Sequence, residues 1–379
     1  MFTNLHCHIS INKYKLLIFF TQFFIKYLKL YLISIIYMVN LVEYVWLGGN
    51  NELRSKTRVL NFSNGNIIIP KWNYDGSSTK QAEGKDSEVI LYPHTVFRCP
   101  FRRNGDNYMV ICSTYKPNGE PIFNNHRHNA NIIFEKYSAE KPWYGLEQEY
   151  FLMDGELPLG LPKEGGKQGQ YYCSVGYNNA FGRKVVEEHL EACIYAGIQL
   201  SGINAEVAPG QWEFQVGAVE GILAADHLWM ARYILQRVAE NYNVSICFHP
   251  KPVLGDWNGS GCHTNFSTKL MREGNENHTG LHYIKHAIEK LGYKHQQHMN
   301  VYGSDNNMRM TGAHETASYD KFSYGCADRG ASIRIPNETI QNEKGYFEDR
   351  RPAANCDPYL VTSMICETTC EKIENINTT

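Results

Sequence analysis

Residues 145–150 read Gly-Leu-Glu-Gln-Glu-Tyr, and residues 345–352 read Gly-Tyr-Phe-Glu-Asp-Arg-Arg-Pro. Side chains alternate between the two faces of an extended strand, so Glu147 and Glu149 share a face, as do Tyr346, Glu348 and Arg350. Two neighbouring carboxylates on a half-buried face repel each other unless a cation lies between them. The alternative is a solvated outer face of an edge strand, but the bulky apolar neighbours of these acids favour burial. Both stretches therefore predict a divalent-metal site on a sheet.

Two further segments add acidic and imidazole groups to this set. Residues 205–215 predict a strand, a Pro-Gly turn and a second strand, with Glu206 and Glu213 on either side of the turn. Residues 259–267 open with a glycine loop and then alternate, so that His263, Asn265 and Ser267 share one face. A single histidine is more often a core residue than a ligand, but this one follows a loop suited to close approach.

Six residues are therefore candidate metal ligands: Glu147, Glu149, Glu206, Glu213, Glu348 and His263. Five carboxylates and one imidazole suit Mg²⁺ or Mn²⁺ better than zinc. The sequence contains no Cys-x-x-Cys pair that would indicate a structural zinc.

Four arginines supply positive charge beside these acids: Arg309, Arg329, Arg334 and Arg350. In residues 332–335, Arg334 alternates with two isoleucines and points away from them. Guanidinium groups bind phosphate and carboxylate through paired hydrogen bonds and stay charged. Surface salt bridges are the alternative interpretation of any one of these arginines. Metals and arginines facing one cleft predict phosphoryl transfer to or from an anionic substrate.

From about residue 42 to about residue 369 the sequence resembles eukaryotic-type (type II) glutamine synthetase. The segments that carry the resemblance are residues 71–79, 145–150, 204–215, 255–268, 309–318, 327–336 and 345–352. The resemblance implies that ATP drives the ligation of ammonia to L-glutamate through a γ-glutamyl phosphate intermediate. It also implies two or three Mg²⁺ or Mn²⁺ ions per site, and a homo-oligomer of stacked rings with active sites between subunits.

The fold implied by the resemblance is α+β. A small β-grasp-like domain over residues 42–135 precedes a catalytic domain over residues 141–370, which has a curved antiparallel sheet flanked by helices. The polar run at residues 135–142 is interpreted as a linker. An atypical apolar extension occupies residues 1–41, and a tail occupies residues 371–379.

The resemblance also implies roles by position. Glu149, Glu206 and Glu213 look like ligands of one metal, and Glu147, His263 and Glu348 like ligands of the metal at the nucleotide phosphates. Substrate-binding residues are expected to be Arg309, Arg350, Asn258 and Gly259. Nucleotide-binding residues are expected to be Glu213, Asn265, Ser267, Arg329, Arg334 and Tyr346. The catalytic residues are expected to be Arg309, Glu315 and Asp75. Glu315 would cover the intermediate, and Asp75 would bind ammonium in the active site of the neighbouring subunit.

Five positions depart from the family pattern: Asn337, Cys99, Ala208, Ala218 and Ser260. Asn337 stands where an arginine usually follows Ile-Pro. The absence of that arginine is expected to weaken nucleotide or phosphate binding. None of the five changes removes a predicted metal ligand.

Composition agrees with a metabolic enzyme of 379 residues, a length that usually means two domains. The formal net charge of −2 gives no electrostatic basis for binding nucleic acid. Eleven scattered cysteines imply no disulfide framework and favour a reducing compartment, so we expect a cytoplasmic protein.

The first 41 residues do not fit this pattern. They are rich in Ile, Phe, Leu, Tyr and Lys, but Lys26 and Lys29 interrupt the apolar runs, so neither run reaches the ~18 residues of a membrane span. No arginine precedes Arg54, which disfavours a transit peptide. We expect an upstream extension from a start codon assigned too early, with Met38 near the natural start. A membrane anchor is the less favoured alternative, so a membrane is not expected as a partner.

Three apolar stripes of helical period predict core-facing helices at residues 185–194, 223–238 and 279–291, the first ending near Gly197. His295 and His298 follow the third stripe and are expected at the surface. Two alternatives to the implied function stay open: a related glutamate–amine ligase, and a non-catalytic structural descendant. Retention of every predicted ligand disfavours the descendant, and the carboxylates of Asp75 and Glu315 favour ammonia as the amine.

Overall fold

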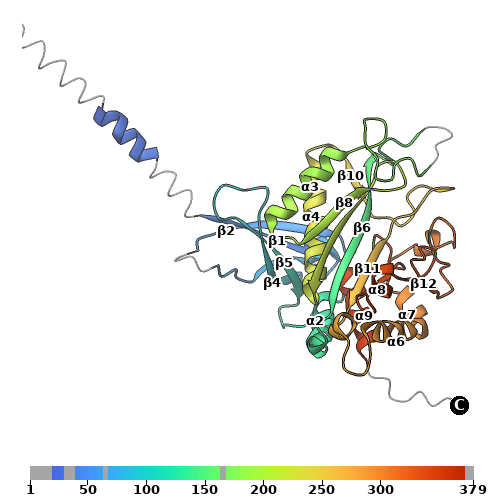
Figure 1. Cartoon of the computed structure of the whole chain (residues 1–379). Coiled ribbons are helices and arrows are strands. Elements are labelled where there is room, and N and C mark those ends of the chain that lie inside the picture. Colours follow the sequence, from blue (N-terminus) through green and yellow to red (C-terminus); the bar gives the residue numbers. More distant parts are fainter. Residues whose placement is uncertain (1–18, 30–38, 63–66, 163–167, 372–379) are drawn as a thin grey trace, which may run out of the picture.

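The computed structural model describes residues 19–29, 39–62, 67–162 and 168–371. Two sheets with helices packed on them make an α+β fold, as predicted (Figure 1). The first sheet has the strand order β2-β1-β5-β4-β3, and only the β1–β5 pair is parallel. Its strands are β1 Asn40–Leu47, β2 Leu53–Leu60, β3 Trp72–Asp75, β4 Glu88–Arg98 and β5 Tyr108–Tyr115.

The second sheet carries the predicted acidic strands. Its main path runs β12-β13-β14-β11-β6-β9-β8, and β7 and β10 also pair with β6. Every pairing except β12–β13 is antiparallel. The strands are β6 Trp143–Asp154, β7 Leu157–Pro158, β8 Leu200–Ala205, β9 Gln211–Glu220, β10 Ser245–Cys247, β11 Cys262–Ser267, β12 Tyr324–Cys326, β13 Ile333–Ile335 and β14 Phe347–Asp349. The long strand β6 lies between β11 and β9, so its side chains sit at the centre of the sheet.

The helices of the folded body include α2 His126–Lys136, α3 Arg183–Ala196, α4 Ile222–Glu240, α5 Lys269–Glu273, α6 Gly280–Tyr293, α7 His295–Met299, α8 Asn337–Gln341 and α9 Pro358–Cys370. Of these, α3 and α4 contact the second sheet, and α9 contacts α2, α4 and α6. The three predicted stripes lie in α3, α4 and α6 and are largely buried, except that Ile194 and Leu223 are 61% and 44% exposed. Gly197 ends α3 in the left-handed conformation that glycine adopts at little cost, and Thr279 precedes the first turn of α6. The predicted linker contains the last two residues of α2 and a 3₁₀ turn at Ser138–Glu140.

A buried carboxylate joins the first sheet to helix α4. Glu43 of β1 is 3% exposed and forms ion pairs of 2.8 Å with both Arg102 and Arg237. The hydroxyl of Tyr233 on α4 donates to the same carboxylate. Burial alone would raise the pKa of Glu43, but these partners hold it below its usual value, so the charge persists at neutral pH.

The prediction that His295 and His298 lie at the surface is wrong. His298 is fully buried, and its ring nitrogens lie 2.6 Å from the Tyr302 hydroxyl and 2.9 Å from the Thr368 hydroxyl. His295 is 8% exposed, with one ring nitrogen 3.0 Å from the Tyr319 carbonyl. Polar partners from distant segments satisfy both rings, and such partners leave no trace in local sequence periodicity. The Asn-Gly-Asn sequence of residues 64–66 predicts a turn, but these residues lie outside the described ranges.

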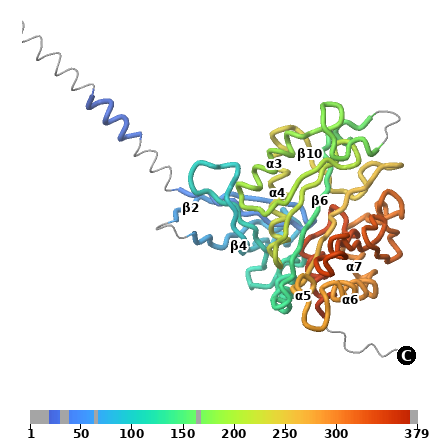
Figure 2. The backbone as a smooth tube through the Cα atoms, in the orientation of Figure 1, coloured from blue at the N-terminus to red at the C-terminus, as the bar shows by residue number. Residues whose placement is uncertain are grey.

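Residues 19–29 form a helix that stands away from the folded body (Figure 2). Its apolar side chains are 47–67% exposed: Phe19, Phe20, Phe23, Phe24, Ile25, Tyr27 and Leu28. No helix among the described residues is both long and apolar enough to cross a bilayer. The structure therefore leaves a large apolar surface in contact with solvent, and surfaces of this kind favour association.

We predict that a chain starting at Met38 has a larger soluble fraction than the full chain, because the exposed aromatic helix is removed. The activity that the resemblance implies should be unchanged per chain. Sedimentation after expression and an activity assay of both chains test this. As a control, the full-length double variant Phe20→Glu/Phe24→Glu should regain the solubility of the shorter chain. Equal solubility of all three chains would contradict the prediction.

Candidate active site

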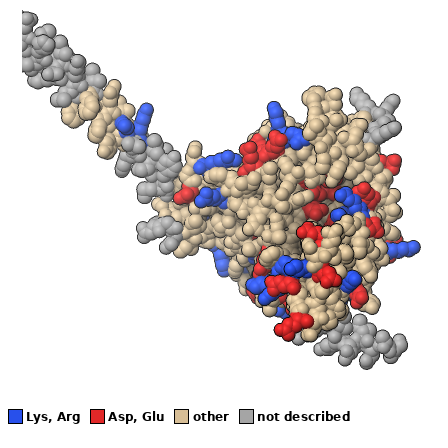
Figure 3. Space-filling model, viewed as in Figure 1, with Lys and Arg blue, Asp and Glu red and all other residues tan. Residues whose placement is uncertain are grey.

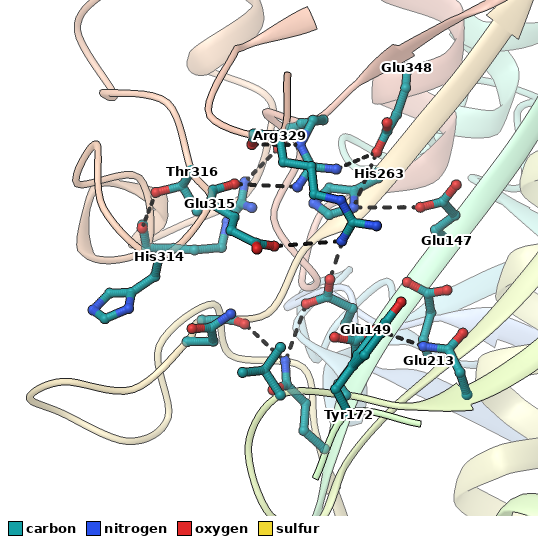
Figure 4. A pocket seen from close by; sticks show the side chains of 18 of the residues that line it. Glu147, Glu149, Tyr172, Glu213, His263, His314, Glu315, Thr316, Arg329 and Glu348 are labelled. Atoms are coloured by element: carbon teal, nitrogen blue, oxygen red, sulfur yellow. Dashed lines mark hydrogen bonds and ion pairs between the residues drawn. The ribbon is translucent and has the colours of Figure 1, made fainter. Parts of the chain in front are cut away.

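A cavity of about 490 Å³ opens on one face of the second sheet and contains the predicted acids. All six candidate metal ligands line it, and so do the four predicted arginines, Asn258, Gly259 and Glu315. Figure 4 shows the acids on the sheet facing Arg329 and Glu315, which lie on loops across the cavity. On the face shown in Figure 3, acidic and basic side chains lie next to one another to the right of centre.

The first group of ligands contains three glutamates. One carboxylate oxygen from each of Glu149, Glu206 and Glu213 lies within 4.8 Å of the others. Strand pairing brings Glu149 of β6 opposite Glu213 of β9, and Glu206 follows the end of β8. An Oε2 atom of Glu149 accepts a 2.8 Å hydrogen bond from the Gly261 amide. Three carboxylates at this separation match the oxygen ligands of a hard divalent cation.

The second group combines an imidazole with two carboxylates. Nδ1 of His263 lies 3.6 Å from a carboxylate oxygen of Glu147 and 3.6 Å from one of Glu348. Pairing of β11 with both β6 and β14 places the three side chains together. Burial lowers the pKa of His263 well below its ordinary value, and Arg350 lowers it further. The imidazole is therefore neutral at pH 7 and has a lone pair for a metal.

Burial makes the three carboxyl groups of the first group unusually weak acids. It raises the pKa of Glu149 to about 7, of Glu206 to about 8 and of Glu213 to about 9. Repulsion among the neighbouring carboxylates adds to the effect of burial in each case. These groups hold protons in the absence of a cation, and a bound divalent ion would replace those protons. The donor set and its electrostatics thus fit Mg²⁺ or Mn²⁺.

Arg309 is fixed beneath the cavity by the backbone. Its Nη2 donates to the carbonyls of residues 350, 351 and 352 at 2.7–3.2 Å, and its Nε donates to Asn306 at 3.0 Å. Burial lowers the pKa of Arg309 to about 10, which leaves the guanidinium charged at neutral pH. A Cβ on Gly261 would lie 3.0 Å from both Arg309 Nη1 and a ring nitrogen of His263. The glycine loop is therefore needed for the arginine and the ligand histidine to approach each other.

The other arginines lie at the opposite wall. Arg334 and Arg350 form ion pairs of 3.0 and 2.6 Å with Glu348. Arg329 forms a longer pair, 3.6 Å, with Glu315. The Nε of Arg334 is buried and finds no hydrogen-bond partner among the described residues. An unpaired guanidinium donor at the wall of a cavity favours an anionic ligand there.

Four predicted site residues do not line this cavity. Asn265 lies beside it and donates a 2.7 Å hydrogen bond to Glu147. Ser267 is buried and accepts from Arg272 at 2.9 Å, and Tyr346 is 40% exposed next to Glu348 on β14.

Asp75 lies on the first sheet and is exposed. It caps the 3₁₀ turn at Gly76–Thr79 and accepts hydrogen bonds from the hydroxyls of Ser77 and Ser78. These bonds, first that of Ser78, lower the pKa of Asp75, so the carboxylate stays ionised. An exposed ionised carboxylate outside the cavity of its own chain is available to a neighbouring molecule.

Sequence analysis missed several residues that line the cavity: Tyr172, Asn204, Gln211, Gln215, His314 and Thr316. Asn204 and Gln215 lie two positions from Glu206 and Glu213 and donate 2.7 Å hydrogen bonds to them. The same strand spacing that linked Glu147 to Glu149 could have identified both amides. Tyr172 and His314 lie on loops, and no local pattern marks them.

Comparison with known proteins agrees with this geometry. The family described as glutamine synthetase, catalytic domain, matches residues 127–376. The chain belongs to the glutamine synthetase family. A putative glutamine synthetase of Acanthamoeba polyphaga mimivirus is 62% identical over 340 residues, which cover 88% of this chain and 95% of that protein.

Plant members of the glutamine synthetase family are also similar. The cytosolic isozyme 1-1 of Oryza sativa subsp. japonica is 56% identical over 340 residues, which cover 87% of this chain and 93% of that protein. Glutamine synthetase N-1 of Phaseolus vulgaris is 57% identical with the same coverage.

None of the five departures from the glutamine synthetase pattern lines the cavity, although Ala208 and Ser260 directly follow the lining residues Val207 and Gly259. Asn337 begins helix α8 and is exposed, and it does not line the cavity. Cys99 and Ala208 are buried in the core. Ser260 is buried, and its hydroxyl finds no partner among the described residues.

We predict that metal binding releases protons near neutral pH, because Glu206 and Glu213 carry raised pKa values of about 8 and about 9 and must lose their protons to bind a cation. At pH 7, calorimetry with Mn²⁺ in buffers of different ionisation enthalpy should detect about one to two protons released per site. Affinity should rise as pH increases from 6 to 9. Glu213→Gln should lower the proton count, whereas the exposed Glu187→Gln should not. Binding without proton release at pH 7 would contradict the electrostatic assignment.

Proposed function

We propose that this chain is a glutamate–ammonia ligase. An oxygen of the glutamate γ-carboxylate attacks the γ-phosphorus of ATP, and ADP leaves. The nitrogen of ammonia then attacks the carbonyl carbon of the γ-glutamyl phosphate, phosphate leaves with the electrons of the broken C–O bond, and the nitrogen loses a proton to give glutamine. The observation that carries the proposal is one cavity in which two groups of metal-ligand type face arginines that can bind carboxylate and phosphate.

The proposed metal ligands are the two groups described above. Glu149, Glu206 and Glu213 hold one Mg²⁺ or Mn²⁺ ion, and Glu147, His263 and Glu348 hold another. The ions supply positive charge that offsets the negative charge developing on the transferred phosphoryl group. Neutral His263 and the deprotonated glutamates supply lone pairs without needing to change protonation during the reaction.

The proposed substrate contacts follow from the positions of the arginines. Arg309 and Arg350, with Asn258 and Gly259, bind glutamate. The buried position of Arg309 fixes the guanidinium before substrate arrives, so little freedom is lost on binding. The residues proposed to contact the nucleotide are Glu213, Asn265, Ser267, Arg329, Arg334 and Tyr346.

Ammonia binding is proposed to need two chains. The exposed Asp75 of one subunit reaches the cavity of its neighbour in a homo-oligomer of stacked rings. Its carboxylate stays ionised and attracts ammonium, while Glu315 covers the intermediate and excludes water. We also propose that residues 42–135 form the small domain and residues 141–370 the catalytic domain, and that the enzyme acts in the cytoplasm, as the name of its rice relative states for that protein.

We predict that Glu348→Ala abolishes formation of γ-glutamyl hydroxamate from glutamate, ATP and hydroxylamine, whereas the wild-type chain forms it. Loss of this carboxylate removes a metal ligand and leaves Arg334 and Arg350 without their partner. A loss of at least about a thousandfold is expected at saturating Mg²⁺. The exposed Glu338→Ala on α8 is the matched control and should keep full activity. Near-normal turnover of Glu348→Ala would refute the assignment.

A mixing experiment tests the shared site. Rings of only Asp75→Asn or only Glu213→Gln should be inactive. Randomly mixed rings contain interfaces where the intact Asp75 of one subunit meets the intact Glu213 of another, and at equal proportions these are about one quarter of all sites. Recovery of activity near that fraction is expected after dissociation and reassembly. Mixed rings without activity would show that each chain supplies its own Asp75.

A further inference from the structure

Residues 313–316 cross the mouth of the cavity in an unusual backbone conformation. His314 and Glu315 have φ angles of 54° and 59°, a region that residues with a side chain rarely adopt. Two such residues in succession persist only where surrounding contacts hold them. We call residues 313–316 the cover segment. What fixes it determines whether the cavity is closed.

One side of the cover segment contacts the arginines of the site. The Glu315 carboxylate lies 3.6 Å from Arg329, and the Glu315 carbonyl accepts a 3.3 Å hydrogen bond from Arg350. Within the segment, the hydroxyl of Thr316 donates to the Ala313 carbonyl at 2.8 Å. The ring of His314 points the other way, away from the carboxylates on the sheet (Figure 4).

The His314 ring joins two further loops. Its Nδ1 lies 2.9 Å from Nε2 of Gln168, and its Nε2 lies 2.9 Å from Oδ1 of Asp256. Gln168 in turn accepts a 2.6 Å hydrogen bond from the backbone amide of Asn258. Asn258 is one of the residues proposed to bind glutamate, so a single imidazole links that loop to the cover segment.

The hydrogen-bond directions in this chain of contacts are determined. The Asn258 amide can only donate, so the Gln168 atom that faces it is the oxygen, and the Gln168 nitrogen therefore faces His314. That nitrogen donates to Nδ1, which must lack a proton. The proton of the neutral ring is then on Nε2 and points at the Asp256 carboxylate. His314 is thus an acceptor on one side and a donor on the other.

We propose that His314 is a positioning residue that fastens the cover segment to the glutamate-binding loop. This rests on the proposed function of the cavity. His314 acts through Glu315 and Asn258. Its hydrogen bonds to Gln168 and Asp256, which we call the bridge, hold Glu315 over the cavity and Asn258 at the glutamate site. Closure and glutamate binding are therefore coupled, and the γ-glutamyl phosphate is shielded from water until ammonia reacts.

Four variants test the two halves of the bridge. His314→Ala removes both. His314→Asn retains an acceptor close to the position of Nδ1, and His314→Gln retains a donor close to the position of Nε2. Gln168→Leu removes the link to Asn258 from the other side. The exposed His278→Ala, outside the cavity, is the matched control.

The measurements are KM for glutamate, kcat, and the ratio of phosphate released to glutamine formed. We expect His314→Ala to raise KM for glutamate about tenfold, the effect of losing one well-made hydrogen bond. The ratio should rise above one, because water reaches the acyl phosphate. His314→Asn should restore KM in part, and the effects of His314→Ala and Gln168→Leu should not add, because both break the same bridge. His278→Ala should match the wild type.

Two results would overturn the proposal. One is an unchanged KM and a one-to-one ratio in His314→Ala. The other is a lower kcat at an unchanged ratio, with Mn²⁺ affinity like that of the wild type, since this would indicate a merely structural role. If instead the wild-type chain forms no glutamine and no hydroxamate, the proposed function itself fails, so the two failures are distinguishable.

Discussion

The repulsion among buried carboxylates is the constraint on which the site depends. Five glutamates and one histidine converge on one cavity, and burial raises the pKa values of three of them to about 7, 8 and 9. Such an arrangement opposes folding, because buried carboxyl groups lose their contact with water and repel one another when they ionise. It persists because the ligands lie on, or immediately after, strands of one sheet, and the centre of that sheet, β6, is packed on the core. The fold thus supplies the rigidity, and a divalent cation, if bound, would supply the positive charge that offsets these carboxylates.

Acidic residues on the same sheet also fix the positions of arginine side chains. On β14, Glu348 faces the cavity and pairs with two arginines, while its neighbour Asp349 faces the core. Asp349 there forms a 2.7 Å ion pair with the fully buried Arg351 and accepts a hydrogen bond from Tyr302. Neighbouring acidic residues of β14 therefore pair with arginines on opposite faces of the sheet. Alternation of strand side chains assigns one residue to chemistry and the next to packing.

Sequence alternation predicted the part of the site that strands build. Glu147 with Glu149, and His263 with Asn265, share faces as expected, because strand geometry has a period of two. The same reasoning could have identified Asn204 and Gln215. It could not identify His314, whose role depends on contacts with residues 58 and 146 positions away in the chain. The burial of His298 could not be predicted either, because its partner Thr368 lies far away in the sequence.

The division between strands and loops follows from what each set of residues must do. Metal ligands must keep fixed separations, because hard cations demand defined oxygen positions, and sheet residues provide them. The cover segment, in contrast, lies on a loop whose backbone angles are held by side-chain contacts and not by strand pairing. Asp75 belongs to neither set, since it is exposed on a different sheet, held ionised by its own serines. If Asp75 completes the cavity of a neighbouring chain, as proposed, assembly is a condition of activity, because the cavity of a single chain lacks that carboxylate.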